Sequence, residues 1–336
     1  MKETFFEYNM HELGYVDEIM KNSLIILDTN VLLNLYRFNK ENREKFFEIL
    51  EKIQDRLFLT YQSGKEFYKN RLNIIDKKIK FKDSLKDEVS KELIRVENKL
   101  INCNFTNDTV TLLKQDDELK NNLLNSIKNC ENEINKIIEE YNYDIIDEYY
   151  FYNDPILKKI LNIFEGKINK ELSEKEKKQI YEEGKNRYIK KIPPGYEDKK
   201  TKQEPDCYGD LIIWNEMINI SKDKNTNVLF ISNDTKEDWL ENFNGKTQGP
   251  RKELIKEFKQ KTNHHFYAIT DSVFIQKISE LHNIKDIETL KKESENIQNE
   301  MDNSQEAISH FFTEYYELQT LVRNFAYFDR IHEIVK

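Results

Sequence analysis

The stretch Ser23-Leu24-Ile25-Ile26-Leu27-Asp28-Thr29-Asn30 decides how the rest of the chain is interpreted. Four consecutive apolar residues end at an aspartate, which is typical of a short strand buried on both faces of a parallel sheet. From Val31 onward the apolar residues have helical spacing, and Thr29 or Asn30 is a suitable N-cap. Asp28 is therefore expected at the carboxyl end of a strand, where open α/β sheets bind ligands. It could equally be a simple helix cap, and this stretch alone does not decide between the two.

Three further apolar runs predict strands of the same sheet, at residues 56–61, 227–232 and 265–269. A helical pattern follows each of them, and after 227–232 we expect a loop first, with the helix starting at Pro250. Alternation of strands and helices is typical of a parallel sheet covered by helices on both faces. We therefore predict an α/β fold, a three-layer α/β/α arrangement with a Rossmann-like parallel sheet.

The alternation is interrupted between the second and third predicted strands. Apolar residues there recur at spacings of three and four, at Leu85, Val89, Leu93, Val96 and Leu100. This spacing predicts two long helices, with a break near 102–108, that form an antiparallel, coiled-coil-like arm. Shorter helices are expected from 144 to 196. The resulting prediction is a discontinuous domain, 1–75 with 185–283, a helical insertion, 76–184, and a helical C-terminal tail, 284–336.

Composition limits the class of protein. The chain has 336 residues, of which 38% are hydrophobic and 34% are charged, as in a soluble helix-rich protein. The net charge of −9 argues against a protein that coats nucleic acid, but it leaves room for a local basic patch. Residues 185–202 contain seven basic residues against two acidic ones, around a Pro-Pro-Gly turn. They are a candidate phosphate contact, with an ordinary exposed loop as the alternative.

Cysteine usage and hydropathy indicate the compartment. The three cysteines, Cys103, Cys130 and Cys207, are far apart, which argues against a disulfide framework and against a zinc site. No stretch approaches the roughly 20 apolar residues that a membrane-spanning helix needs. We therefore expect a cytoplasmic protein without a membrane partner.

Four acids occupy equivalent positions relative to these elements. Asp28 and Asp234 follow strands, and Glu66 and Asp210 lie in or beside the first turn of a helix. In a parallel three-layer fold all four would converge at one edge, where they would raise one another's pKa unless cations neutralise them. Oxygen-only ligands suit Mg²⁺ or Mn²⁺, and two such ions can promote in-line cleavage of a phosphodiester.

Helix capping is the alternative for each acid taken singly. Ser63 and Glu66 match the capping box Ser-x-x-Glu, and Asp210 would interact favourably with a helix dipole. Capping is a less economical explanation for four acids together than for any one of them.

Several strings resemble the motifs of PIN-domain nucleases. They are Leu27-Asp28-Thr29-Asn30-Val31, the acid Glu66 after the second strand, Gly209-Asp210, and Phe230-Ile231-Ser232-Asn233-Asp234. Longer strings resemble a bacterial PIN-like subgroup with a helical insert: 192–200, 209–214, 234–239 and 249–254. The resemblance covers 23–75 and 185–281, and leaves the arm and the tail outside.

This resemblance implies a three-layer PIN-like fold and a metal-dependent nuclease, more often an endoribonuclease than a DNA nuclease. It implies Mg²⁺ or Mn²⁺, as two ions, held by Asp28, Glu66, Asp210 and Asp234, with Asp238 as a fifth acid. The residues expected to orient Asp28 or to contact the nucleic acid are Thr29, Asn30, Lys236, Lys199, Lys200 and Arg251. One departure concerns Asn233, because a second acid or a small residue is expected before Asp234. Which group of this loop binds metal therefore stays open.

Two other functions remain open. The chain could be an inactive PIN-like scaffold, in which the helical arm binds a protein partner or a second copy and the acids only cap helices. It could also be a phosphatase like the haloacid dehalogenases, which place an aspartate after the first strand. That chemistry needs a second acid two residues later, and position 30 is Asn.

Overall fold

The structure, a computed structural model, describes residues 5–8, 13–102, 117–140, 148–243 and 246–303. The chain divides into two compact units. One consists of 1–71 with 156–336 and holds the sheet, and the other consists of 72–155. Each is described by itself.

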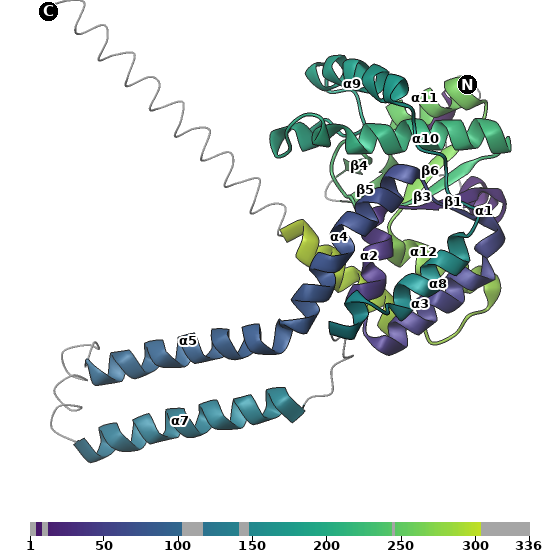
Figure 1. Ribbon diagram of the computed structural model, residues 1–336. Coiled ribbons are helices and arrows are strands. Elements are labelled where there is room, and N and C mark those ends of the chain that lie inside the picture. The colour runs from purple at the N-terminus through teal and green to yellow at the C-terminus, as the bar shows by residue number, and fades with distance from the viewer. Residues whose placement is uncertain (1–4, 9–12, 103–116, 141–147, 244–245, 304–336) are drawn as a thin grey trace, which may run out of the picture. The chain divides into compact units, whose positions relative to one another are not determined.

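A parallel sheet of four strands, in the order β2-β1-β3-β6, forms the centre of the first unit (Figure 1). The strands are β1 (Leu24–Leu27), β2 (Leu57–Phe58), β3 (Val228–Ile231) and β6 (Phe266–Ile269). Leu27 pairs with Ile231, so β1 and β3 end side by side. The predicted α/β fold with a parallel sheet is confirmed.

Helices cover both faces of this sheet. In chain order they are α1 (Leu13–Asn22), α2 (Thr29–Arg37), α3 (Lys40–Lys52), α4 (Tyr61–Ile79), α8 (Pro155–Phe164), α9 (Glu174–Ile189), α10 (Gly209–Lys224), α11 (Lys252–Thr262) and α12 (Asp271–His282). Residues 288–303 are also helical. Short 3-10 helices are η1 (Phe6–Tyr8), η2 (Gln54–Arg56), η3 (Glu148–Phe151), η4 (Glu197–Lys200) and η5 (Asp206–Tyr208). Helices α10 and α11 lie on one side of the strands, and α2, α3 and α12 lie on the other (Figure 1).

Aromatic side chains fill both interfaces between sheet and helices. Trp214 of α10 packs against Phe258 of α11, with ring centroids 5.5 Å apart, in a cluster that includes Phe230 of β3. On the other side, α3 and α12 meet through Phe46 and Phe274, 6.5 Å apart. Because side chains alternate across a strand, a strand buried on both faces needs apolar residues at every position, as the four strand sequences have.

The segment before α11 differs from the prediction. We expected a loop, with a helix starting at Pro250, but β4 (Leu240–Phe243) and β5 (Lys246–Pro250) form an antiparallel hairpin and α11 starts at Lys252. The sequence of β5, Lys-Thr-Gln-Gly-Pro, has no alternation of apolar residues. It therefore carries none of the periodicity by which strands are predicted.

The second unit consists mainly of α5 (Phe81–Ile101) and α7 (Asp117–Glu140), which lie side by side (Figure 1). Lys86, early in α5, pairs with Glu139 at the end of α7, and Leu100 packs against Leu124. The two helices are therefore antiparallel, as predicted. The helix that leads into them is divided, because α4 ends at Ile79 and α5 begins at Phe81. Most of the predicted break at 102–108 lies outside the described residues, and the predicted domain boundaries stay a prediction.

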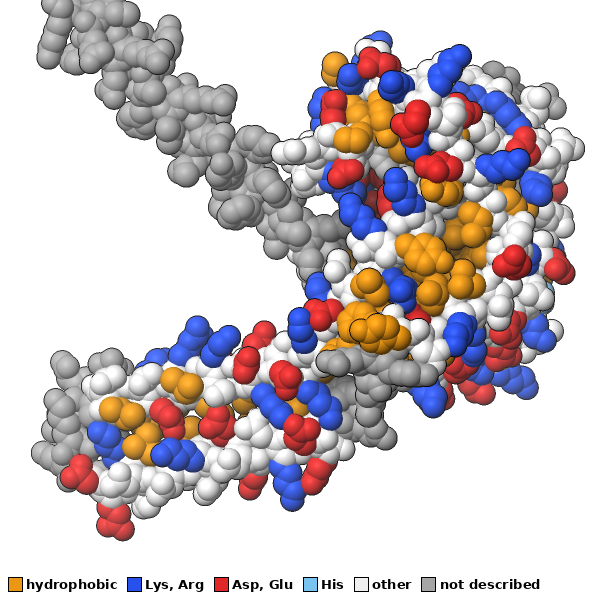
Figure 2. Space-filling view, in the orientation of Figure 1, with side chains coloured by type: hydrophobic (Ala, Val, Ile, Leu, Met, Phe, Trp, Pro, Cys, Tyr) orange, Lys and Arg blue, Asp and Glu red, His pale blue; other side chains and the backbone are white. Residues whose placement is uncertain are grey.

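The surface of the described residues is mixed in charge. On the face shown in Figure 2, basic and acidic side chains are interspersed over the α/β unit. Within the described ranges no helix combines the length and the apolar character needed to cross a bilayer. The cytoplasmic location stays a prediction.

Candidate active site

Acidic side chains from four separate segments come together at the carboxyl edge of the sheet. Asp28 follows β1, Asp234 lies in the loop after β3, Glu66 lies in the second turn of α4, and Asp210 lies in the first turn of α10. The charges of Glu66 and Asp234 act on Asp28, and the charge of Asp234 acts on Asp210. The structure thus brings together the acids that the sequence places at this edge.

Asp28 accepts hydrogen bonds through both of its oxygens. Its Oδ1 accepts from the backbone of Thr29 at 2.7 Å, and its Oδ2 accepts from Asn30 Nδ2 at 2.8 Å and from Ser232 Oγ at 2.6 Å. Asp28 is also the N-cap of α2, so the capping interpretation holds for this acid. Burial raises its pKa from 3.8 to about 7, against the effect of the Ser232 hydrogen bond and together with the charges of Glu66 and Asp234. A cation at this edge would favour the ionised form.

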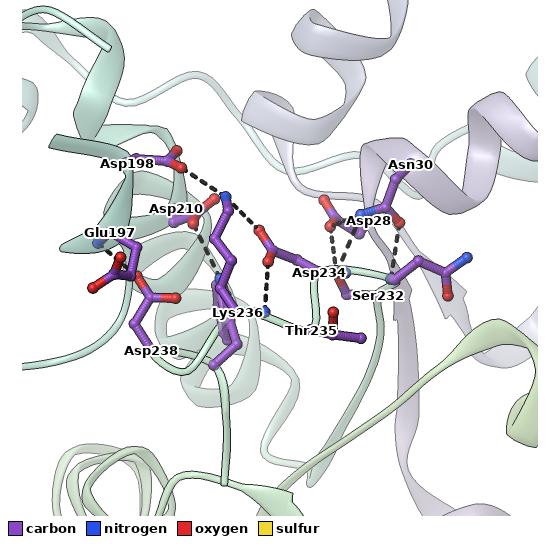
Figure 3. A network of polar contacts seen from close by, with 12 residues as sticks. Asp28, Asn30, Glu197, Asp198, Asp210, Ser232, Asp234, Thr235, Lys236 and Asp238 are labelled. Atoms are coloured by element: carbon purple, nitrogen blue, oxygen red, sulfur yellow. Dashed lines mark hydrogen bonds and ion pairs between the residues drawn. The ribbon is translucent and has the colours of Figure 1, made fainter. Parts of the chain in front are cut away.

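Ser232 connects Asp28 to the loop after β3. Its Oγ donates to Asp28 Oδ2 and accepts from the backbone N of Asp234 at 3.0 Å (Figure 3). Asn30 Oδ1 accepts from the backbone N of Asn233 at 3.1 Å. Two hydrogen bonds therefore fix the loop that carries Asp234 to the start of α2.

The start of α4 does not have the predicted capping box. Thr60 Oγ1 accepts from the backbone N of Ser63 at 3.2 Å, so the helix begins at Tyr61, with Thr60 as its cap. Ser63 lies inside the first turn, and Glu66 lies one turn too far along to reach the cap. Thr60 and Ser63 both suit a helix cap. The sequence pattern indicated Ser63, but Thr60 is the cap in the structure.

Glu66 instead faces the start of α2. Its Oε1 accepts from Gln62 Nε2 at 2.7 Å, and its Oε2 lies 3.4 Å from Thr29 Oγ1, which also lies 3.1 Å from the carbonyl of Ser63. A Cβ at Gly209 would lie 2.9 Å from Glu66 Oε1. Only glycine therefore lets the start of α10 approach Glu66 this closely.

Another buried acid, Glu216 of α10, contacts the start of α4. It is 1% exposed, and its Oε2 accepts from the backbone N of Gln62 at 3.1 Å. Burial raises its pKa to about 7, against the effect of the backbone hydrogen bonds at the start of α4. Glu216 was not predicted, although a single acid within the largely apolar run 211–220 is a signal for a buried, hydrogen-bonded carboxylate.

Asp210 lies between the hairpin and the Pro-Pro-Gly turn. Its Oδ2 accepts from Trp239 Nε1 at 3.1 Å. Burial raises its pKa well above the usual range, the charges of Asp198 and Asp234 add to this, and Lys236 opposes it. Gly195 has a φ of +87°, and a Cβ there would lie 3.0 Å from Asp210 Cβ, so the turn packs directly on this acid.

Lys236 bridges two acids of the site (Figure 3). Its Nζ lies 2.7 Å from Asp198 Oδ1 and 3.0 Å from Asp234 Oδ2, and its backbone N donates to Asp234 Oδ1 at 3.1 Å. Lys202 Nζ lies 2.5 Å from the other oxygen of Asp198. Burial would raise the pKa of Asp198, but the two lysines outweigh it and hold the pKa below its usual range. Asp198 was not predicted, although it lies within the string 192–200.

Asp238 and Asn233 both accept hydrogen bonds from backbone N–H groups of other segments. No helix begins at Asp234 in the described chain, so Asp238 does not face Asp234 across a helical turn. Asp238 is fully buried, its Oδ2 accepts from the backbone N of Glu197 at 3.0 Å, and burial raises its pKa to about 6. Asn233 Oδ1 accepts from the backbone N of Asp271 at the start of α12. Asp234 and Asp238 both lie among the other acids, since the charge of Asp238 acts on Asp210 and the charge of Asp234 acts on Asp238.

The basic side chains that were predicted to contact nucleic acid differ in their exposure and in their contacts within the protein. Lys199 and Lys200 are exposed in η4, where Lys200 pairs with Glu197. The guanidinium of Arg251 lies 2.6 Å from Glu253 Oε1 and donates to the carbonyl of Glu237 at 3.1 Å. Arg251 is thus engaged within the protein, whereas the two lysines are on the surface.

A comparison with protein families gives a match to the family described as PIN like domain, over residues 24–254. This range is more than half of the chain and contains the four converging acids. The chain belongs to the PIN-like domain family. PIN-like domains are often nucleases and typically bind metal. The matched range of this PIN-like protein also includes residues 76–184, which are predicted to be an insertion. Neither the curated proteins nor the solved structures give a match.

The donor set of this PIN-like domain fits a hard divalent cation. Asp28 and Glu66 offer only oxygen atoms, and the hydrogen bonds that they accept from described residues come from neutral groups. Among the described residues, no group of three or more Asp, Glu, His or Cys side chains is arranged to hold one ion by itself. Mg²⁺ does not need such a group, because it retains several waters and is usually bound through one or two carboxylates. Asp28 and Glu66, which both lie beside Thr29, are therefore compatible with such an ion.

Proposed function

We propose that this PIN-like protein is a Mg²⁺- or Mn²⁺-dependent endoribonuclease. The observation that carries the proposal is the convergence of Asp28, Glu66, Asp210 and Asp234 at one edge of the sheet. Helix capping explains only the first of them. Glu66 accepts from a side chain within its own helix, and Asp210 accepts from an indole. No helix follows directly after Asp234 in the described chain.

Each polar neighbour has a defined task in this proposal. Ser232, Asn30 and the backbone N of Thr29 hold the carboxylate of Asp28 in one orientation. Thr29 Oγ1 lies against Glu66 and fixes the second carboxylate relative to the first. A bound divalent ion would supply Lewis acidity toward the phosphodiester and lower the pKa of its bound water.

The substrate in this proposal is RNA, bound through its phosphates. The turn at Gly195 packs on Asp210, and the exposed Lys199 and Lys200 follow it in η4. A phosphate backbone that contacts these lysines would pass close to the acids. Membership of the PIN-like family supports a nuclease, and the choice of RNA over DNA rests on the resemblance to PIN-domain ribonucleases.

The alternatives have less support. A dehalogenase-like phosphatase needs an acid at position 30, and Asn30 there donates to Asp28 and accepts from Asn233. An inactive scaffold is the second candidate, since membership of a fold family does not by itself establish chemistry. Partner binding or self-association through the 76–184 arm stays a prediction.

Cleavage assays separate these functions. Purified full-length protein is incubated with labelled RNA and with DNA of the same sequence, in Mg²⁺, Mn²⁺ or EDTA. We expect RNA cleavage only with metal, and loss of cleavage in the Asp28→Asn, Asp210→Asn double variant. The matched control is Asp223→Asn, which removes an exposed acid from the far end of α10.

Each other result rejects a stated part of the proposal. Cleavage by the double variant, or in EDTA, would reject the site. Cleavage of DNA alone would reject the substrate. Hydrolysis of phosphomonoesters alone would favour the phosphatase, and capture of a partner through the arm without any cleavage would favour the scaffold.

A further inference from the structure

The acid cluster is divided by the charge of its hydrogen-bonding partners. One half, Asp234 and Asp198, contacts the ammonium of Lys236 at 3.0 and 2.7 Å. The other half, Asp28 and Glu66, accepts hydrogen bonds only from neutral groups of the described residues. Within the described ranges, Lys236 therefore supplies a positive charge beside Asp234 and Asp198, and also acts on Asp210, whereas no described cation contacts Asp28 or Glu66.

The position of Lys236 is fixed by several contacts. Both oxygens of Asp234 accept from this one residue, Oδ1 from its backbone N and Oδ2 from its Nζ. The side chain of Asp198, the other partner, is only 2% exposed, and that of Lys236 is 25% exposed. A partly buried ammonium between two carboxylates is held more firmly than a surface lysine, because releasing it would leave Asp234 without a charged partner and Asp198 with Lys202 alone.

We propose that Lys236 is a built-in cation of the site, and that the chain consequently binds one divalent ion, at Asp28 and Glu66, rather than two. This inference rests on the proposed metal-dependent nuclease. An ammonium neutralises carboxylates as a metal ion does, but it donates hydrogen bonds and cannot accept a lone pair. The metal is then needed where acids repel one another without a lysine. The prediction of two ions was based on the number of acids. It did not take into account the ammonium of Lys236, which lies among them.

Lys236 has a matched control within the same network. Lys202 also contacts Asp198, through Oδ2 at 2.5 Å, but it does not contact Asp234. Replacing Lys202 therefore removes a positive charge from Asp198 and leaves the cation next to Asp234 in place. Replacing Lys236 removes the cation that both acids share, and leaves Lys202 on Asp198 alone.

Direct binding of Mn²⁺ to the full chain, followed by electron paramagnetic resonance and isothermal titration calorimetry, tests the proposal without an activity measurement. We expect one ion per chain for the wild type, for Lys202→Met and for Lys236→Arg. We expect a second ion in Lys236→Met, because Asp234 and Asp198 then lack their shared cation. A second ion in the wild type, or a single ion in a folded Lys236→Met, would overturn the proposal.

A second variant keeps the test decisive if Lys236→Met does not fold. Asp28→Asn is expected to abolish Mn²⁺ binding, since it removes a ligand of the one ion. Retention of one tightly bound ion in Asp28→Asn would show an independent ion elsewhere in the cluster and would overturn the proposal. A wild type that binds no Mn²⁺ but cleaves RNA would instead reject the metal dependence itself.

Discussion

Replacement of Asp28 by Asn is expected to stabilise the metal-free protein, and to do so more at high pH than at low pH. Burial raises the pKa of Asp28 from 3.8 to about 7 in the folded protein. Between these two values the folded chain binds more protons at this position than the unfolded chain does. Its stability therefore falls as the pH rises through this window.

The size of the effect follows from this pKa difference. At pH 8 the shift costs the fold about 4 kcal/mol, and at pH 5 it costs about 1.7 kcal/mol. Asn keeps the capping oxygen that accepts from Thr29, but its amide replaces the oxygen that accepts from Asn30 and Ser232. The hydroxyl of Ser232 can accept from that amide, so only the bond from Asn30 is lost, at a cost of about 1.5 kcal/mol. The net expectation is a gain of about 3 kcal/mol at pH 8 and almost no change at pH 5.

Urea unfolding in EDTA, at pH 5 and at pH 8, measures both values. Glu216 and Asp238 also have raised pKa values, but they titrate in both proteins and largely cancel in the difference. Asp223→Asn, which removes an exposed charge, is expected to change the free energy of unfolding little at either pH. An Asp28→Asn protein whose difference from the wild type is the same at both pH values would refute the reasoning.

Three further predictions concern the surroundings of the acids. In Ser232→Ala, loss of the hydrogen bond that lowers the pKa of Asp28 is expected to move the rising limb of the pH–rate profile upward by about one unit, which kcat/KM measurements across the pH range would show. In Gly209→Ala, the new Cβ would lie 2.9 Å from Glu66 Oε1 and displace this carboxylate, so we expect the cleavage rate to fall at least about tenfold. The circular dichroism spectrum of this variant is expected to match that of the wild type. In Gln298→Ala, the loop after β3 loses a 2.8 Å hydrogen bond to the C-terminal helix, so the Mg²⁺ concentration for half-maximal cleavage is expected to rise several-fold.

The Gln298→Ala prediction has a control on the same helix. Glu293 accepts from Asn39 and Asn42 of the α3 region, away from the loop after β3. Glu293→Ala is expected to lower the melting temperature without changing the Mg²⁺ requirement. Equal changes of the Mg²⁺ requirement in both variants would show that the helix acts only through overall stability.

The strands and the placement of the acids could be predicted because their signals are local. Four apolar residues before Asp28 indicate a strand buried on both faces, and the same pattern before Ser232 indicates its neighbour. Parallel pairing then requires both carboxyl ends to lie at one edge. The hairpin β4–β5 could not be predicted in this way, because its second strand contains Gly and Pro and has no apolar alternation.

The contacts between segments could not be predicted from local patterns. Ser232 and Asp28 are 204 positions apart in the chain, and Lys236 and Asp198 are 38 apart. Nothing in the spacing of charges shows that a lysine will lie between two of the acids. The cap of α4 illustrates a different limit, because Thr60 and Ser63 both suit a cap and only the three-dimensional structure selects Thr60.

The most direct test of the central claim is the rate of Mg²⁺-dependent RNA cleavage by Asp28→Asn at pH 8. At this pH the metal-free variant is expected to be more stable than the metal-free wild type, so a loss of activity is not explained by unfolding of the variant. Removal of a carboxylate that holds the catalytic ion is expected to lower the rate by at least about 100-fold. A rate close to that of the wild type would contradict the claim that Asp28 belongs to a metal-dependent nuclease site.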